Sequence, residues 1–307
     1  MPASMDMDPP KFPRAGAARL APGAREGGDR PAPAPGWSPL VSIVTVVYRG
    51  AETLAETIAS VAAQDYDGIE YIVIDGGSTD GTVELIEQNQ RHISYWRSEP
   101  DGGIYDAMNK GIGLARGQLI KLLNADDLLC PGSVGRAAQA YRDGAAGGVI
   151  QSDLELIDER GAFIKVMRAD RARNPFGGVV HPSWYVDRAV YERHGLYLPS
   201  FRVSADYELF ARLQTRRVRF FHLDPPLVRF RAGGASSGFT GLAERYRVNR
   251  HYLGTAAALR FLALHGYVKV RGRIARAVFD EHALAAIQRR LSAASGLRSS
   301  SRSRPSR

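Results

Sequence analysis

The sequence is poor in cysteine and in long apolar runs. Its 307 residues include one cysteine, Cys130, which excludes an internal disulfide and a metal site built on several cysteines. Met1–Trp37 contains no apolar run long enough to act as the core of a secretory signal or to cross a bilayer. With 44% apolar residues, these absences indicate a globular protein with a sizeable core and a cytoplasmic location.

Most of the chain also lacks net charge. From Arg260 to Arg307 there are eleven Lys or Arg residues and two acidic ones, a difference that equals the net charge of +9 of the whole chain. The basic excess therefore belongs to one terminal segment. It suits an anionic surface, and membrane lipid or a phosphate-bearing lipid carrier fits as well as RNA does. We expect peripheral contact with the inner membrane face through this segment, and no nucleic-acid partner.

Strand and helix patterns alternate along the first half of the chain. The run Ser42–Tyr48 is continuously apolar, β-branched or aromatic after its first residue, as a strand buried on both faces requires. Helical spacing of apolar residues follows in Ala51–Gln64. The alternation continues with strands at Glu70–Asp75, Ile93–Arg97 and Gln118–Leu123, and with helices at Thr82–Asn89 and Gly103–Ala115. This order predicts an α/β fold with a mostly parallel sheet flanked by helices.

Composition divides the chain into four parts. Residues 1–38 are crowded with Pro, Gly, Ala and Arg, which predicts a disordered tail. Residues 39–230 form the predicted α/β domain, 231–292 a C-terminal helical extension, and 293–307 a disordered basic tail. Within the extension, Val270–Leu291 has an amphipathic pattern, so it could lie on a membrane surface or pack on the body.

Acidic residues follow two of the predicted strands. Asp75 ends one strand, and Asp126 and Asp127 follow another. Ligands of open parallel sheets bind beyond the carboxyl ends of the strands. Two adjacent carboxylates there repel each other unless they coordinate a hard divalent cation that prefers oxygen ligands. Alternatively, Asp127 caps the following turn. Spacing alone leaves both interpretations open.

Glycine loops of the common nucleotide-binding kinds are missing. An acid that ends the second strand could hold the ribose of a dinucleotide, but no G-x-G-x-x-G loop follows the first strand. No G-x-x-x-x-G-K-[ST] loop is present either. A nucleotidyltransferase would need a glycine-rich loop with Arg and Lys near the first strand, where only Arg49 and Gly50 stand. The sequence therefore disfavours a dinucleotide-binding protein and a nucleotidyltransferase.

Three stretches of the chain resemble one enzyme family. Residues 41–82, 99–117 (EPDGGIYDAMNKGIGLARG) and 122–127 (LLNADD) resemble family 2 glycosyltransferases of the GT-A fold in their order and spacing. The resemblance continues more weakly through HPSWY and SADYELF to about Phe230. It implies the GT-A fold and an inverting transfer of a sugar from a nucleotide-diphosphate donor, a UDP-sugar, to a lipid-linked or polysaccharide acceptor in cell-surface glycan biosynthesis.

The same resemblance assigns a donor site. The positions expected around the nucleoside are Thr45, Val47, Tyr48, Asp75 and Ser78. Asp75 would accept a hydrogen bond from a uracil ring nitrogen, and Gly76 replaces the aspartate that is common at the second position of this turn. The positions expected around the diphosphate and the donor sugar are Asp101, Gly103, Asp106, Asn109 and Asp126. Asp106 and Asn109 could instead cap the N-terminus of the helix to which they belong.

The resemblance also implies a cation and a base. Asp126 and Asp127 would hold Mg²⁺ or Mn²⁺, with Asp127 as the direct ligand and Asp126 also meeting the sugar or the ribose. The cation would neutralise charge that builds on the leaving diphosphate. Asp206 is the expected base that takes the proton of the acceptor hydroxyl, although it could also cap the helix that follows. Glu208 is the reserve candidate.

An acceptor site is expected at His181, Trp184 and Glu208. An aromatic face beside small polar groups suits the C–H face and the hydroxyls of a sugar, but a His beside a Trp could equally be a structural pair. The alternative to an enzyme is a non-catalytic nucleotide-sugar-binding scaffold at the membrane. The retained acids Asp126, Asp127 and Asp206 favour the enzyme, because a scaffold needs no base.

Overall fold

The computed structural model describes residues 7–11, 20–28, 41–169, 179–233 and 239–264. The chain divides into two compact units, Met1–Val248 and Asn249–Arg307. The first unit holds the sheets and the cavities. In the second, residues 249–253 and 255–264 are helical.

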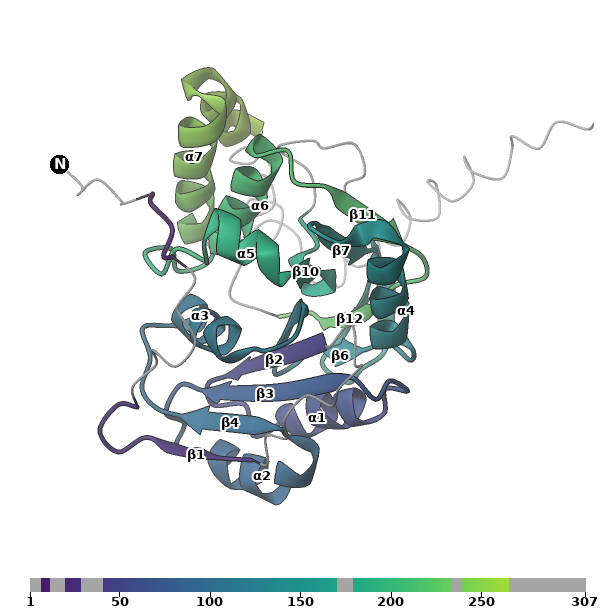
Figure 1. The fold of residues 1–307 in the computed structure, drawn as a ribbon. Coiled ribbons are helices and arrows are strands. Elements are labelled where there is room, and N and C mark those ends of the chain that lie inside the picture. Colours follow the sequence, from purple (N-terminus) through teal and green to yellow (C-terminus); the bar gives the residue numbers. More distant parts are fainter. Residues whose placement is uncertain (1–6, 12–19, 29–40, 170–178, 234–238, 265–307) are drawn as a thin grey trace, which may run out of the picture. The chain divides into compact units, whose positions relative to one another are not determined.

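The first unit is built on an eight-stranded sheet with the strand order β1-β4-β3-β2-β5-β10-β7-β11 (Figure 1). Its strands are β1 (Arg25–Gly27), β2 (Val41–Val47), β3 (Ile69–Asp75), β4 (Tyr95–Ser98), β5 (Leu119–Asn124), β7 (Val149–Ser152), β10 (Tyr185–Asp187) and β11 (Phe220–Leu223). Strands β4, β3, β2 and β5 are parallel neighbours, and β11 is parallel to β7. Only β1 and β10 run antiparallel to their partners. The predicted mostly parallel α/β sheet is confirmed.

The central strands are buried on both faces, as their sequences predict. All seven residues of β2 are buried, and β2 pairs with β3 from Val41↔Ile69 to Val47↔Asp75. On one face, Val41 and Ile43 belong to the same core cluster as Leu54 and Ile58 of α1 (Leu54–Ala62). Helices on both faces of the sheet therefore explain why the sequence of β2 is almost continuously β-branched and apolar.

Helices cover the two faces of the sheet. α2 (Thr82–Gln88) and α4 (Ser133–Ala140) add Val83 and Val134 to the core cluster on the α1 side. On the other face, α3 (Ile104–Leu114) packs against β2 and β3, where Gly111 faces the side chains of Val44 and Ile74. The remaining helices of the first unit are α5 (Arg188–His194), α6 (Ala205–Thr215), α7 (Phe239–Leu253, which runs on into the second unit), and short turns at Gln90–His92, Tyr141–Ala145 and His181–Ser183.

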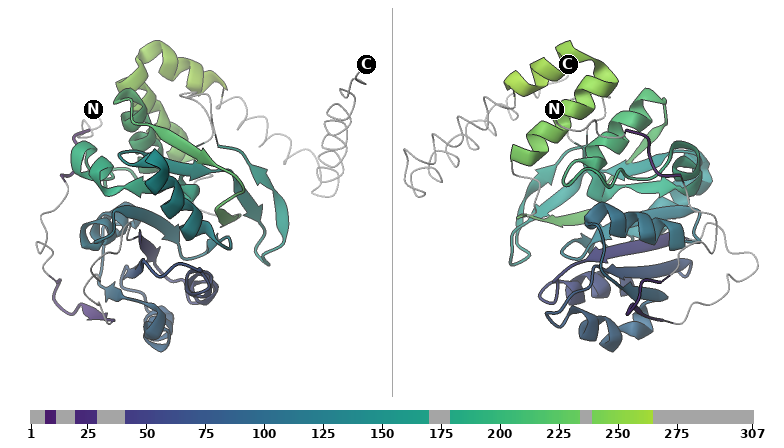
Figure 2. Two further views of the ribbon diagram at one scale, coloured as in Figure 1. Left: turned by 45° about the vertical axis from the view of Figure 1, so that its right-hand side comes forward. Right: turned by 90° about the vertical axis from the view of Figure 1, so that its left-hand side faces the viewer.

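A second, smaller sheet was not predicted from the sequence. Its four strands have the order β6-β12-β8-β9 and are β6 (Leu128–Leu129), β12 (Val228–Arg231), β8 (Leu154–Ile157) and β9 (Phe163–Met167). It begins directly after β5, so it stands beside the carboxyl ends of the large sheet. Figure 2 shows the hairpin of β8 and β9, in teal, at the margin of the ribbon.

The structure differs from the sequence prediction near the N-terminus. Residues 25–27, inside the predicted tail, form β1, which pairs with β4 from Arg25↔Ser98 to Gly27↔Trp96. An ion pair of 2.5 Å between Arg25 and Glu87 supports this edge strand. The amphipathic stretch Val270–Leu291 and the tail 293–307 lie outside the described residues.

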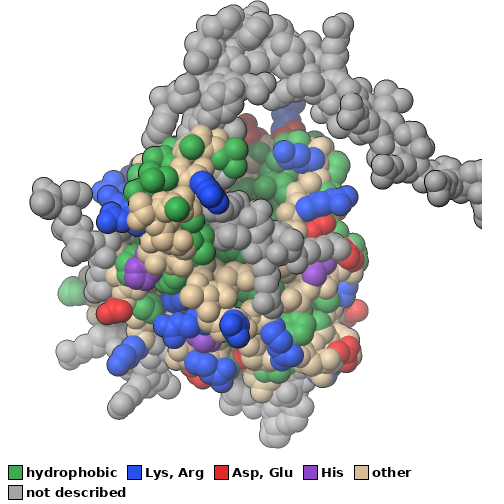
Figure 3. All heavy atoms as spheres, turned by 90° about the horizontal axis from the view of Figure 1, so that it is seen from above, with side chains coloured by type: hydrophobic (Ala, Val, Ile, Leu, Met, Phe, Trp, Pro, Cys, Tyr) green, Lys and Arg blue, Asp and Glu red, His purple; other side chains and the backbone are tan. Residues whose placement is uncertain are grey.

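Two surface features bear on the predicted membrane contact. Among the described residues, no helix combines the length and the apolar character that spanning a membrane requires. On the face drawn in Figure 3, Lys and Arg side chains are spread widely, and Asp and Glu side chains lie mainly toward the right and lower margins.

Candidate active site

Two adjoining cavities open at the carboxyl ends of the central parallel strands. The first measures about 680 Å³ and the second about 620 Å³, and both are lined by Val46, Val47, Tyr48 and Ile104. They lie where β3 follows on one side of β2 and β5 on the other. This reversal of strand order is the position at which open α/β sheets bind ligands.

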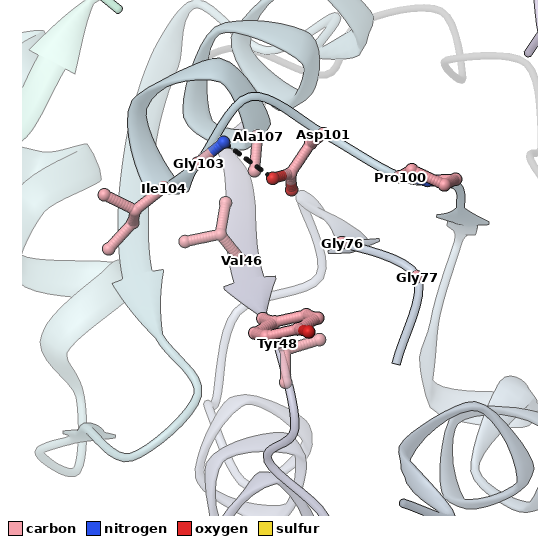
Figure 4. A pocket seen from close by; sticks show the side chains of 10 residues that line it. Val46, Tyr48, Gly76, Gly77, Pro100, Asp101, Gly103, Ile104 and Ala107 are labelled. Carbon is pink, nitrogen blue, oxygen red and sulfur yellow. Dashed lines mark hydrogen bonds between the residues drawn. The ribbon is translucent and has the colours of Figure 1, made fainter. Parts of the chain in front are cut away.

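The first cavity presents an aromatic ring and a carboxylate (Figure 4). The Tyr48 side chain is 62% exposed, and the guanidinium of Arg49 lies 5.4 Å from its ring centroid. Asp101 Oδ1 accepts a hydrogen bond of 2.8 Å from Gly103 N, and burial raises the pKa of Asp101. A Cβ atom at Gly76 would stand 2.7 Å from Asp101 Oδ2, so the glycine makes room for this carboxylate.

Asp75 lies beneath this cavity rather than in its wall. Its carboxylate is fully buried and accepts hydrogen bonds from Gly77 N, Ser78 N, Ser78 Oγ and Ser98 Oγ at 2.5 to 3.0 Å. Thr45 is buried as well, with its Oγ1 3.0 Å from the phenol oxygen of Tyr71. Of the residues predicted around the nucleoside, Val47 and Tyr48 line the cavity, while Thr45, Asp75 and Ser78 are not among its lining residues.

Asp126 and Asp127 follow β5 and point to different surroundings. Asp126 lines the second cavity, and burial raises its pKa. Asp127 is fully buried, and its two oxygens accept hydrogen bonds from Arg231 N at 3.1 Å and from Asn124 Nδ2 at 3.0 Å. Burial, followed by the neighbouring charge of Asp126, raises the pKa of Asp127 to about 8. The carboxylate that is open to a ligand is therefore that of Asp126, whereas the sequence favoured Asp127.

Arg231 of β12 fixes this acidic turn, and the sequence analysis did not identify it. Its Nε donates to Asp126 O at 3.1 Å, and its Nη2 donates to Glu56 Oε2 at 2.7 Å. Its Nη1 donates to Glu159 O at 2.6 Å. The guanidinium thus joins α1, the turn after β5 and the end of β8, and it is 6% exposed.

A buried lysine stands behind the same strand end. Lys121 of β5 is fully buried, donates from Nζ to Pro182 O, and lies 5.3 Å from the ring centroid of Tyr185. Burial lowers the pKa of Lys121 to about 7. The lysine connects β5 to the His181–Ser183 turn, which forms another part of the second cavity.

Asp206 lies in the first turn of α6 and lines the second cavity, as Asp126 does. Its Oδ1 accepts hydrogen bonds from Tyr207 N at 2.7 Å and from the phenol of Tyr105 at 3.3 Å. Burial raises the pKa of Asp206, and the nearby charge of Arg245 opposes this shift. Two carboxylates from distant parts of the chain thus border one space.

Tyr197 organises the wall beside Asp206. Its ring stacks on Tyr105 with centroids 5.7 Å apart, and its phenol oxygen lies 2.6 Å from His181 Nε2. Asn109 holds the Tyr197 backbone with both ends of its amide, at 2.9 and 3.0 Å. Burial lowers the pKa of His181 to about 3, so the imidazole is neutral. His181 lines the second cavity, while Asn109 positions Tyr197 and does not line either space.

Three other predicted residues do not line either cavity. Trp184 is 2% exposed and packs against Phe220, with ring centroids 5.4 Å apart. Glu208 is fully buried and forms an ion pair of 2.8 Å with Arg212. Asp106 accepts from Gly102 N at 3.0 Å and lies 3.4 Å from Lys110 Nζ. Trp184 and Glu208 therefore stabilise the fold around α6, and Asp106 supports the loop before α3.

A separate group of potential cation ligands lies at the carboxyl ends of β7 and β11. Ligand atoms of Asp153, His222 and Asp224 all lie within 4.8 Å of one another. His222 Nε2 is 3.4 Å from Asp224 Oδ1 and 3.7 Å from Asp153 Oδ1. These residues are not among those that line the two cavities.

Comparison with known proteins gives consistent results. The family model described as Glycosyl transferase family 2 matches residues 42–198. An uncharacterized glycosyltransferase of Mycobacterium tuberculosis is 46% identical over 105 residues, which cover 34% of this chain and 40% of that protein. One from Rickettsia typhi is 28% identical over 221 residues, covering 68% of this chain and 69% of that protein. The matched region thus spans 40% of the length of the mycobacterial relative.

Solved structures agree on the fold. The crystal structure of residues 1–349 of Staphylococcus aureus TarS in complex with UDP-GlcNAc has a TM-score of 0.55 and 18% sequence identity, covering 69% of this chain and 65% of that chain. The complex of the same protein with UDP has the same TM-score and 16% identity, covering 73% and 69%. The GT-A-type fold predicted from the sequence is confirmed.

Proposed function

The chain belongs to glycosyl transferase family 2, and we propose that it moves a sugar from a UDP-sugar, with inversion, to a lipid-linked or polysaccharide acceptor. The observation that carries this proposal is that Asp126 and Asp206 line the second cavity, which adjoins the first cavity with Tyr48 and Asp101 in its wall. A donor that spans both spaces would bring its anomeric carbon between the two carboxylates.

The first cavity is proposed to bind the nucleoside. Tyr48 offers an exposed ring on which a base can stack, and Asp101 offers a hydrogen-bond acceptor beside it. Asp75 would act indirectly, because its carboxylate holds the Gly77–Ser78 turn. The complexes of TarS with UDP and UDP-GlcNAc support a uridine nucleotide here, although the identity between the two chains is low.

A divalent cation fits at Asp126. Mg²⁺ and Mn²⁺ favour carboxylate oxygens, and one or two protein carboxylates together with substrate phosphates are a common ligand set. Asp126 meets this requirement because it borders the cavity, and Arg231 holds its backbone in place. A bound cation would neutralise charge on the leaving diphosphate. Asp127 would support the turn from the interior.

Asp206 is proposed as the base. An acceptor hydroxyl that enters the second cavity would give its proton to the Asp206 carboxylate. The oxygen of that hydroxyl would attack the anomeric carbon of the donor sugar, and the bond from this carbon to the diphosphate would break on the opposite face. The raised pKa of Asp206 suits that role, because a base with a pKa nearer the working pH accepts a proton more readily. Tyr105 and Tyr207 N would hold the carboxylate in one orientation.

The direct test is UDP release by the purified full chain with a panel of UDP-sugars, Mg²⁺ or Mn²⁺, and extracts of lipid-linked glycans as acceptors. Asp206→Asn should lower turnover at least about a hundredfold while donor binding by calorimetry stays within about twofold. Asp67→Asn, the same change at an exposed turn, is the matched control. Tight UDP binding without release from any donor would favour the non-catalytic scaffold.

A further inference from the structure

Strand β9 is an exposed apolar edge. All five of its residues are exposed, although four of them are large and apolar. The exposed fractions are 58% for Phe163, 48% for Ile164, 44% for Val166 and 37% for Met167. The strand is the last of its sheet, with a partner only in β8 among the described residues. An apolar edge strand of this kind is usually a contact surface.

The apolar side chains project from both faces of the strand. Met167 pairs with Leu154 and shares its face, whereas Val166 lies on the opposite face beside Glu155 and Arg229. A strand that covers a core alternates apolar and polar residues, with one face buried. β9 instead exposes apolar groups on both faces.

One end of β9 reaches the second cavity. Met167 and Leu154 line that cavity together with Phe230 of β12. The exposed apolar side chains therefore continue from the cavity wall outward along β9 to Phe163. Whatever contacts β9 lies next to the entrance through which an acceptor would approach Asp206.

The charges on β9 and on the residue that follows it are positive, while the acids of this hairpin, Glu155, Asp158 and Glu159, lie on β8 and in the turn. Residues 162–169 contain Lys165 and Arg168 and no acidic residue, and both side chains are exposed. Lys165 is also the middle residue of the strand, so antiparallel pairing with a second copy about this centre would place two ammonium groups opposite each other. An edge lysine of this kind opposes strand pairing between copies. Cations beside partly inserted apolar groups favour an anionic lipid surface.

We propose that β9 docks on the interfacial region of a bilayer that contains anionic phospholipid. Phe163, Ile164 and Val166 enter the boundary between headgroups and acyl chains, while Lys165 and Arg168 contact the phosphates. This contact is distinct from that expected of the basic C-terminal segment. It brings the mouth of the second cavity to the membrane, where a lipid-borne acceptor would be presented.

The test places an environment-sensitive dye on the full chain at Phe163→Cys, since Cys130, the one native thiol, is buried. The control carries the dye at Glu84→Cys, an exposed position on α2. With phosphatidylglycerol vesicles the emission at 163 should shift to shorter wavelength, with little change in phosphatidylcholine, and the emission at 84 should not shift. Binding of the protein without a shift at 163 would assign the contact to the C-terminal segment alone and overturn the proposal.

A second readout uses affinity. Ile164→Ser should weaken binding to phosphatidylglycerol vesicles about fivefold, because part of one apolar side chain is withdrawn from the lipid. Leu20→Ser is the matched control, since Leu20 is 43% exposed, and it should leave the affinity unchanged. An apolar dye signal at 163 before vesicles are added would mean that a chain segment or a second copy covers β9, which also refutes the proposal. Both readouts measure lipid contact and are independent of sugar transfer.

Discussion

The phenol oxygen of Tyr105 lies 3.3 Å from Asp206 Oδ1, although the two residues are 101 positions apart in the sequence. Tyr105 belongs to α3, which follows the loop of Asp101 and Gly103, and Asp206 belongs to α6. The contact therefore joins the element that borders the first cavity to the carboxylate that we propose as the base. It also allows the state of that base to be probed without changing the carboxylate itself.

We expect Tyr105→Phe to shift the pH dependence of turnover. The hydrogen bond from Tyr105 lowers the pKa of Asp206 and opposes the larger, raising effect of burial. Its loss should raise this pKa further, and because a base works only above its pKa, the acid limb of the kcat profile should move to higher pH. A net hydrogen bond of about 0.5–1.5 kcal/mol corresponds to about 0.4–1 pH unit.

The matched control for this shift is Tyr191→Phe. The Tyr191 phenol oxygen lies 3.3 Å from that of Tyr197, so the change removes a buried hydroxyl from the same cluster and leaves the contact between Tyr105 and Asp206 in place. Its acid limb should stay at the parent pH. An equal shift in both variants would mean that packing of the cluster, rather than the hydrogen bond to Asp206, sets the profile.

Asp126→Asn and Asp127→Asn should affect the metal requirement differently. Asp126 lines the cavity, so its loss should raise the Mn²⁺ concentration for half-maximal UDP release by about a hundredfold or more. Asp127 faces Arg231 N and Asn124 in the interior, where a carboxamide can keep the bond from Arg231 N. Titration of Mn²⁺ with each variant should therefore leave Asp127→Asn within about tenfold of the parent. The reverse order of the two effects would restore Asp127 as the direct ligand.

The sequence identified the strand ends but not the direction of each side chain. Buried β-branched and apolar runs located β2, β3 and β5. The carboxyl end of β5 indicated Asp126, whereas the family resemblance indicated Tyr48 and Asp101, and all three residues line the cavities. Which of two adjacent aspartates faces the cavity depends on a hydrogen bond from Arg231, 104 positions away from Asp127, and no local pattern encodes such a contact.

The elements that the sequence analysis missed are short or depend on distant partners. β6 and β12 have two and four residues, and the pairing of β12 with β6 and with β8 joins parts of the chain far apart in sequence. α5 did have a local signal, because Asp187 accepts a hydrogen bond from Ala189 N as an N-cap. The roles of Trp184 and Glu208 were not readable, since burial rather than residue type separates a structural side chain from a binding one.

Arg231→Lys should weaken the metal site without touching a ligand. A lysine cannot reproduce the separate bonds to Asp126 O, Glu56 and Glu159 O, so the turn that carries Asp126 should become less well fixed. We expect the Mn²⁺ concentration for half-maximal turnover to rise about tenfold. Arg229→Lys, on the same strand but paired at the surface with Glu155, should have no such effect. Unchanged Mn²⁺ dependence in Arg231→Lys would limit Arg231 to a role in stability.

Glu208→Gln should reduce stability and leave the chemistry of the folded protein intact. Glu208 is fully buried and is bonded through both oxygens to Arg212, so a neutral amide leaves a buried guanidinium without its counter-charge. Breaking a buried ion pair in this way costs about 3–5 kcal/mol of unfolding free energy. Bonds from Arg212 to His194 O and Leu196 O remain and should keep the loss near the lower end. Denaturant unfolding measures this loss, with the exposed change Glu192→Gln as control. If Glu208→Gln instead unfolded like the parent but released no UDP, Glu208 and not Asp206 would be the better candidate for the base.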